Sequence, residues 1–252
     1  MLRLAIVLAL AAQTSSPQTA FEVASVKPNT QATAETTVRV DLGGRISITA
    51  APLRWLIASA YGDANGGLRP EQVIGFPAGL RSERFDITAQ TAPEVAPAAA
   101  TSIAMRPFLR TLLEGRFTLR THRDRRELPV YALVRTRLNA LGPRLALSAV
   151  DCSQDNAKCG FQGGPVGRIK AEALSADLLM QLLANASGRI VVDRTGLKGP
   201  FNIDLEWSPD QTASDKPSIF TAVQEQLGLK LESTRAPVDV LVIDSVERPT
   251  PD

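Results

Sequence analysis

The feature that most constrains the fold of this chain is a short phrase that occurs twice. Residues 79–90 read GLRSERFDITAQ, and residues 196–207 read GLKGPFNIDLEW. Each copy has a Gly-Leu pair, a basic residue, and then Phe-x-Ile alternating with polar residues. The interval between the copies is the same, to within one residue, at the glycines and at the phenylalanines. The sequence therefore predicts an internal duplication.

The alternation within the phrase predicts one half-buried β-strand in each copy, because period-two patterning is typical of an antiparallel sheet with one buried face. The apolar face carries Phe85, Ile87 and Ala89, then Phe201, Ile203, Leu205 and Trp207. The polar face carries Asp86, Thr88 and Gln90, then Asn202, Asp204 and Glu206. We expect the shared apolar face to be scaffold, and we expect function to lie where the copies differ.

The similarity extends to both sides of the phrase. Residues 45–62 and 168–188 each begin with Arg-Ile and pass from a short strand into a helix with apolar periodicity. Ser175 is expected to cap the second of these helices, and Pro52 suits the first turn of the other. Further strands are predicted at 72–80 and 189–197, helices at 105–117 and 218–229, and strands at 118–123, 128–136, 229–234 and 236–246.

This order of elements predicts an α+β fold with two pseudo-repeated small units, in each of which helices pack on one face of a mostly antiparallel or mixed sheet. The predicted segments are a signal peptide at 1–12, an N-terminal segment at 13–44, a first unit at 45–137, a connector with a Cys pair at 138–167, and a second unit at 168–249.

The N-terminus predicts a secretory signal peptide. Arg3 precedes an unbroken apolar run over 4–12, and Ala9-Leu10-Ala11 fits the small-x-small cleavage pattern. The run is shorter than the roughly 20 residues that span a bilayer. A buried N-terminal strand or helix is the alternative. No later segment has an apolar run of transmembrane length, so a periplasmic or secreted protein without a membrane span in the mature chain is expected.

Two cysteines, Cys152 and Cys159, lie in the polar stretch DCSQDNAKCG. A closely spaced pair in an exported protein favours a disulfide over a metal or redox site. A zinc site would need further ligands, and the only histidine is His122. A pair of free thiols is the alternative.

The composition excludes several classes of function. With 28 Lys+Arg against 26 Asp+Glu, the net charge of +2 predicts no nucleic-acid binding. Phosphate-loop, dinucleotide-binding, zinc-peptidase and serine-hydrolase motifs do not occur in the sequence. We predict no catalytic residue, no metal ligand and no cofactor.

A basic cluster surrounds the single histidine in the stretch RTHRDRRE. It contains Arg120, His122, Arg123, Arg125 and Arg126. The neighbouring guanidinium groups would disfavour the imidazolium that a catalytic base must form, so an exposed strand or turn histidine is predicted. The cluster is a candidate surface for a protein partner or envelope polymer. The alternative, which the pattern favours, is a charged strand edge that prevents aggregation.

Asp204 and Glu206 share the polar face of the second repeated strand. A pair of carboxylates can hydrolyse a glycosidic bond when one of them is kept protonated. Their counterparts in the first copy are Thr88 and Gln90, so the scaffold does not require carboxylates there. A solvated strand face is the simpler interpretation.

Four blocks carry a resemblance to a known family: FEVASVKPN (21–29), residues 106–134, VVDRTGLKGPFNIDLEWSPD (191–210) and residues 220–249. They resemble a large soil-associated family of exported bacterial proteins of unknown function. Similar domains occur fused behind membrane metallopeptidase sensors that look like antibiotic-response receptors. The resemblance implies export and the Cys pair, and it assigns no catalytic residue.

The preferred hypothesis is an exported, non-catalytic module that binds a protein or a cell-envelope ligand. One alternative is an extracytoplasmic hydrolase that uses Asp and Glu carboxylates in a cleft. Another is a ligand-sensing domain similar to the fused relatives.

Overall fold

The computed structural model describes residues 19–31, 35–63, 66–95, 101–137, 140–150, 152, 159–161, 163, 165–209 and 216–249. The predicted signal peptide and parts of the predicted connector at 138–167 lie outside these residues. The chain divides into two compact units: residues up to Ala60, Pro77–Arg120 and from Ser245 form the first, and Tyr61–Phe76 with Thr121–Asp244 form the second. The predicted units at 45–137 and 168–249 are defined by the similarity of their sequences and not by contacts in the structure. They stay a prediction.

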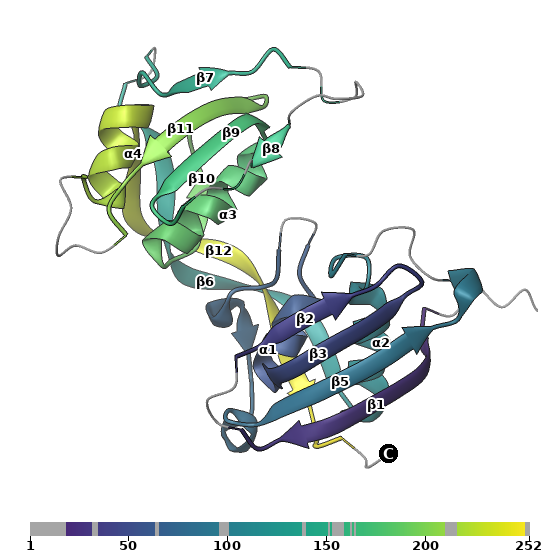
Figure 1. The fold of residues 1–252 in the computed structure, drawn as a ribbon. Helices are drawn as coiled ribbons and strands as arrows, with labels where there is room; N and C mark the ends of the chain where they lie inside the picture. Colours follow the sequence, from purple (N-terminus) through teal and green to yellow (C-terminus); the bar gives the residue numbers. More distant parts are fainter. Residues whose placement is uncertain are drawn as a thin grey trace, which may run out of the picture. The chain divides into compact units, whose positions relative to one another are not determined.

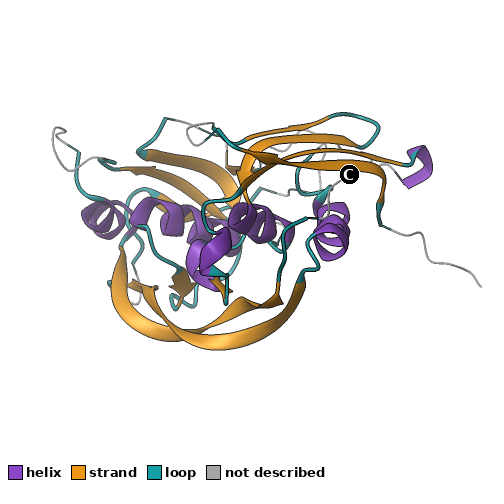
Figure 2. Ribbon diagram, turned by 90° about the horizontal axis from the view of Figure 1, so that it is seen from below, coloured by secondary structure: helices purple, strands orange, loops and turns teal. Residues whose placement is uncertain are grey.

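The first unit contains an antiparallel sheet with helices on one face (Figures 1 and 2). Its strand order is β1-β5-β3-β2. The strands are β1 (Phe21–Asn29), β2 (Thr37–Val40), β3 (Arg45–Pro52) and β5 (Arg84–Thr91). The helices are α1 (Leu53–Ala60) and α2 (Arg106–Arg116), and short 3-10 turns cover Ala78–Leu80 and Pro93–Val95. Because the helices cover one face, the other face of the sheet carries the polar residues.

The core of this unit confirms the predicted alternation. The side chains of Phe85, Ile87 and Ala89 are buried. Phe85 packs edge-on against Phe117, with 5.0 Å between the ring centroids. Pro52, predicted in the first turn of a helix, is instead the last residue of β3. The fixed φ of proline suits extended backbone as well as a first helical turn, so the pattern did not distinguish these positions.

The second unit contains an antiparallel sheet of order β7-β11-β9-β8. Its strands are β7 (Leu145–Leu147), β8 (Gly160–Phe161), β9 (Arg168–Leu174) and β11 (Phe201–Glu206). The helices α3 (Ala176–Ser187) and α4 (Ile219–Leu227) contribute to the core beside this sheet. Ser175 caps α3 as predicted, since its side chain accepts a hydrogen bond from the Leu178 N–H.

A mixed sheet of order β10-β6-β12-β4 completes the second unit. Its strands are β4 (Val73–Ile74), β6 (Arg120–Arg135), β10 (Val191–Asp193) and β12 (Leu229–Ser245), and a 3-10 turn over Pro70–Gln72 leads into β4. The two short strands form its edges, and each runs parallel to its long neighbour: β10 beside β6 and β4 beside β12.

The two long strands correct the sequence prediction, which broke each of them in two. Residues 118–123 and 128–136 were expected as separate strands, but β6 is continuous over 16 residues. Likewise, 229–234 and 236–246 merge into the 17-residue β12. The charged stretch in β6 is not a turn because its neighbour supplies partners: Arg125 Nε lies 3.0 Å from Asp239 Oδ1, and Arg235 donates to the Glu127 carbonyl.

Each antiparallel sheet contains a bulge with an alanine in left-handed conformation. Ala50 in β3 has φ 51° and Ala173 in β9 has φ 49°. The Ala50 N–H donates to Asp86 Oδ1 at 2.7 Å, and the Ala173 N–H donates to Asn202 Oδ1 at 3.0 Å. The strand register shifts beside both alanines, as it does at a β-bulge. A side chain on the neighbouring strand therefore holds each bulge.

Four α-helices and three mostly antiparallel sheets in the described residues confirm the α+β prediction at this coarse level. In the part of the chain that the structure describes, no helix is long and apolar enough to cross a membrane.

Candidate functional site

A pocket of about 550 Å³ opens in the first unit, where the end of β1 meets the start of β5. Its volume falls within the range of small-molecule sites. The pocket is lined by Val26, Pro28, Asn29, Thr30, Ser82, Glu83, Arg84, Phe85, Arg248 and Pro249. Val26 and Phe85 are core residues, with only 3% and 1% of their surface exposed. The lining thus combines core side chains with polar groups.

One ion pair belongs to this lining. Arg248 Nη2 lies 2.7 Å from Glu83 Oε1, and Arg248 Nε donates to the same oxygen at 2.8 Å. The hydrogen bond to Glu83, together with the attraction of its carboxylate, raises the pKa of Arg248 above its ordinary value. The guanidinium is therefore charged throughout the physiological range, and its side chain is 72% exposed.

Two other polar groups of the lining have structural partners. Arg84 Nη1 donates to the Ala50 carbonyl at 2.7 Å, and Asn29 Nδ2 donates to Asp86 Oδ1 at 2.9 Å. These contacts join β1, β3 and β5 at the pocket and prepare its shape before any ligand enters. Arg248 differs because it can exchange one carboxylate for another with little loss of packing. The arrangement suits an apolar molecule that carries an anionic group.

The predicted basic surface lies on β6, and its charges contact nearby groups. Arg123 donates to the Tyr61 carbonyl at 2.6 Å, and Arg120 donates to the Leu119 carbonyl. Arg125 pairs with Asp239 on β12, and Arg126 Nε lies 2.8 Å from Asp124 Oδ2. A role in partner binding stays a prediction.

His122 has a partner that the sequence did not reveal. Its Nδ1 atom lies 2.9 Å and 3.1 Å from the two carboxylate oxygens of Asp244 on β12. The histidine lies within β6, and its side chain is 54% exposed. An exposed strand histidine matches the sequence interpretation, and it lies near the start of β6, opposite the end of β12.

Asp204 and Glu206 share one guanidinium on the open face of the second antiparallel sheet. Arg168 Nη2 lies 2.9 Å from Asp204 Oδ2, and its Nε lies 3.3 Å from Glu206 Oε1. The hydrogen bonds that Arg168 donates to Asp204, together with the charge of that carboxylate, raise the pKa of Arg168 above its ordinary value. Both carboxylates are therefore already engaged by one guanidinium, an arrangement consistent with ion pairs on a solvated strand face.

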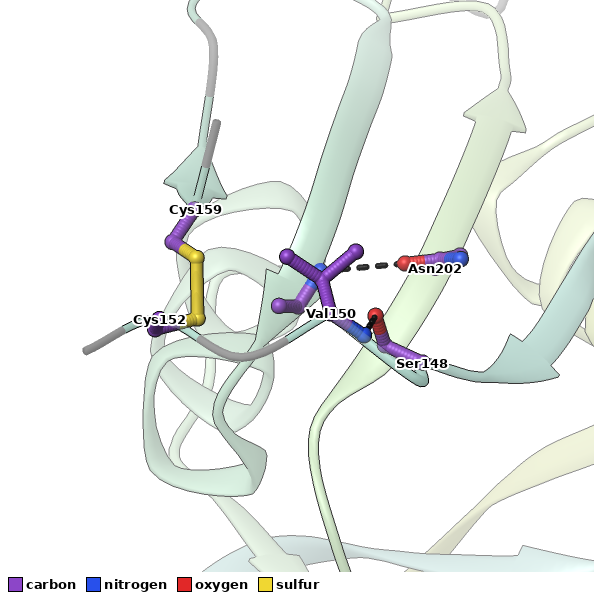
Figure 3. Close-up of a disulfide and its surroundings, with 6 residues drawn as sticks. Ser148, Val150, Cys152, Cys159 and Asn202 are labelled. Atoms are coloured by element: carbon purple, nitrogen blue, oxygen red, sulfur yellow. Dashed lines mark hydrogen bonds between the residues drawn. A yellow bond between two sulfur atoms is a disulfide. The ribbon is translucent and has the colours of Figure 1, made fainter. Parts of the chain in front are cut away.

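Cys152 and Cys159 form a disulfide, with 5.9 Å between their Cα atoms (Figure 3). The bond lies directly before the edge strand β8. Figure 3 also shows Ser148, which accepts the Val150 N–H, and Asn202, the residue that holds the bulge. The disulfide closes a loop at one end of this sheet.

Among the described residues, no group of three or more His, Cys, Asp or Glu side chains could hold a metal ion. The structure and the sequence define the chain as an α+β protein built from three mostly antiparallel sheets. The chain belongs to the family described as "protein of unknown function (DUF3738)", whose model matches residues 54–246. No curated protein and no solved structure matches the chain.

Sequence reasoning missed the pocket in the first unit. Glu83 and Arg248 are 165 positions apart, and although Glu83 lies in the repeated phrase at 79–90, nothing in that phrase indicates a partner near residue 248. A weak signal did exist: the Val-Glu-Arg-Pro stretch at 246–249 lies inside a block that supported the family resemblance.

Proposed function

We propose that this protein is a non-catalytic binding module, and that the pocket of the first unit takes an amphiphilic molecule with an anionic group. The observation that carries the proposal is that one pocket combines two core side chains, Val26 and Phe85, with the exposed guanidinium of Arg248. This guanidinium can exchange its carboxylate partner for the anionic group of a ligand. The apolar part of the ligand would cover the floor, and its anion would replace Glu83 beside Arg248. Lipids of a cell envelope combine both properties.

The predicted export of the chain supports this proposal. The predicted signal peptide and the disulfide are compatible with an extracytoplasmic location. The resemblance to soil-associated exported proteins, and to domains fused behind metallopeptidase sensors, adds support for a module that presents a ligand-dependent surface.

We also infer that residues 45–137 and 168–249 are related copies of one ancestral unit. The two bulges support this: Ala50 and Ala173 share a rare left-handed conformation, and each is held by the residue after a buried phenylalanine. The pocket, by contrast, is not confined to one copy, since Val26 and Asn29 precede residue 45 and Arg248 comes from the second range. Binding is therefore expected to be a property of the first compact unit of the structure, and not of the repeat itself.

The proposal is tested with 8-anilinonaphthalene-1-sulfonate, a fluorescent anionic probe, and with two competitors of equal chain length, decanoate and decanol. Decanoate should bind about two- to fivefold more tightly than decanol, measured by displacement of the probe, because an exposed ion pair adds only a small preference. Arg248→Gln should remove this preference and leave the affinity for decanol unchanged. Glu83→Gln should strengthen decanoate binding, because it removes the competing carboxylate.

Arg39→Gln is the matched control, since Arg39 is an exposed arginine of β2 that does not line the pocket. Ser82→Trp places an indole in the pocket mouth and should abolish probe binding. Equal competition by decanoate and decanol in the unmodified protein would contradict the anionic preference. Full probe binding by Ser82→Trp would show that the pocket is not the site.

A further inference from the structure

A second pocket, of about 510 Å³, lies within the second unit and is independent of the site proposed above. One wall is a stripe of α3 at helical spacing, and a second wall is the loop that precedes β4. The third wall is the edge strand β10. The residues are Asp63, Gly67, Leu68, Arg69, Gln72, Asp177, Met180, Gln181, Ala184, Ile190, Val191, Val192 and Asp193. An edge strand beside a helix is the arrangement in which peptides add to a sheet.

The backbone of β10 has hydrogen-bonding groups directed away from β6. Tyr131 N–H donates to the Ile190 carbonyl, and Arg194 N–H donates to the Leu133 carbonyl. In a parallel ladder these bonds use the alternate residues of β10, so the N–H and C=O groups of Val191 and Asp193 point to the opposite side. β10 is also the terminal strand of its sheet. Two residues thus present a complete donor and acceptor pattern to an incoming strand.

The walls of the pocket are held in place by contacts outside it. Arg69 Nη1 donates to Asn185 Oδ1 on α3 at 3.1 Å, which ties the loop to the helix. Gln72 Nε2 donates to the Asp239 carbonyl on β12 at 3.1 Å, which ties the same loop to the sheet. Asp193 Oδ1 accepts from the N–H and the hydroxyl of Thr195 at 2.7 Å each. The groove is therefore formed before a ligand binds.

The charge of the lining indicates the kind of ligand. Asp63, Asp177 and Asp193 contribute three carboxylates, and Arg69 contributes the single cation. That cation already pairs with Glu71, whose Oε1 lies 2.8 Å from Arg69 Nε. Leu68, Met180 and Ala184 supply apolar surface between the charged groups. A complementary ligand carries basic and apolar side chains.

We propose that this groove binds an extended basic peptide segment, which adds as a strand to the outer edge of β10. Its backbone pairs with Val191 and Asp193, and its basic side chains lie near the carboxylates of Asp63 and Asp177. The ligand is a short segment of another protein. The edge of β10 offers the backbone groups of only two residues, and the pocket has a volume of about 510 Å³.

The probe is the peptide acetyl-Lys-Val-Lys-Val-Lys-amide, measured with the full protein by calorimetry and by amide hydrogen exchange. Two further peptides carry backbone N-methyl groups, one on the valines and one on the central lysine. Because only alternate residues of an added strand bond to β10, one N-methylated peptide should bind at least about tenfold more weakly, and the other should bind like the parent. The Val191 and Asp193 amides should exchange more slowly in the parent complex.

Asp177→Lys should weaken the parent peptide about tenfold, since it replaces an attraction by a repulsion. Glu225→Lys, at an exposed position of α4, is the matched control and should leave the affinity unchanged. Equal binding of both N-methylated peptides, or loss of both, would overturn strand addition. Displacement of the peptide by equimolar spermidine would show that the groove binds cations without strand addition, and this would overturn the proposal. Absence of binding by the parent peptide would overturn it too.

Discussion

The bulges of the two antiparallel sheets are alike in backbone and different in the side chains that hold them. Asp86 Oδ1 accepts both the Ala50 N–H and the Asn29 side-chain amide, so it joins three strands. Asn202 Oδ1 accepts the Ala173 N–H. The first sheet thus uses a carboxylate at a junction beside its pocket, whereas the second uses a neutral amide.

This difference shows which polar positions distinguish the two sheets. In the first unit, polar residues near the bulge organise the walls of a pocket. In the second, the corresponding open face carries the Arg168, Asp204 and Glu206 ion pairs. The bulge itself is common to both, so it belongs to the scaffold, while the neighbouring polar positions distinguish the units.

The largest expected effect comes from removing the buried phenylalanine beside each bulge. Phe85→Ala and Phe201→Ala should each lower the free energy of unfolding by about 3–5 kcal/mol. The loss should be greater at Phe85, because its edge-on contact with Phe117 contributes about 0.5–1.5 kcal/mol. Denaturant titration of each variant measures this. Equal losses would show that the aromatic pair adds nothing beyond burial.

Variants that keep only one of the two tryptophans show in which unit the free energy of unfolding is lowered. Trp55 lies in α1 of the first unit, and Trp207 follows β11 in the second. Trp207→Phe therefore leaves a fluorescent reporter in the first unit alone, and Trp55→Phe leaves one in the second.

The disulfide should matter only to the second unit. Replacing Cys152 and Cys159 by serine should lower its stability by about 2.5 kcal/mol or less, since the bridge closes a loop of about eight residues. The Trp207 signal should shift in denaturant, and the Trp55 signal should not. A shift of both signals by the same amount would mean that the two units unfold together.

Removing the acceptor that holds each bulge should have a similar or smaller effect. Asp86→Ala leaves two donors without their acceptor and should cost about 2–3 kcal/mol, whereas Asn202→Ala leaves one and should cost about 1–2 kcal/mol. Asp86→Asn keeps an acceptor oxygen and is the matched control. A greater loss for Asn202→Ala than for Asp86→Ala, measured by thermal unfolding, would contradict the junction role of Asp86.

The smallest effect has the opposite sign. Ala50→Gly and Ala173→Gly should stabilise the protein by about 0.5–1 kcal/mol, because glycine adopts the left-handed conformation without steric cost. Ala51→Gly, at the next position of β3, should destabilise it by a similar amount. Melting temperatures of the three variants test this, and destabilisation by all three would refute the strain at the bulges.

Local sequence pattern predicted much of the fold. The helices near 53, 106, 176 and 219, the strands around Phe85 and Phe201, and the Ser175 cap all follow from periodicities and caps within a few residues. The same reasoning broke β6 and β12 in two, because the charged run and the Arg-Ala-Pro step resemble connections when their cross-strand partners are unknown. It also gave no sign that the short strands β4 and β10 pair in parallel.

The sequence by itself determined the elements and their buried faces, because side-chain alternation and helical spacing depend on neighbours along the chain. Only the tertiary structure decided which distant residues meet: Glu83 with Arg248, His122 with Asp244, and the edge of β10 with α3. The physical reason is that each of these contacts is weak alone. Their positions follow from the packing of whole sheets and helices, which no local pattern encodes.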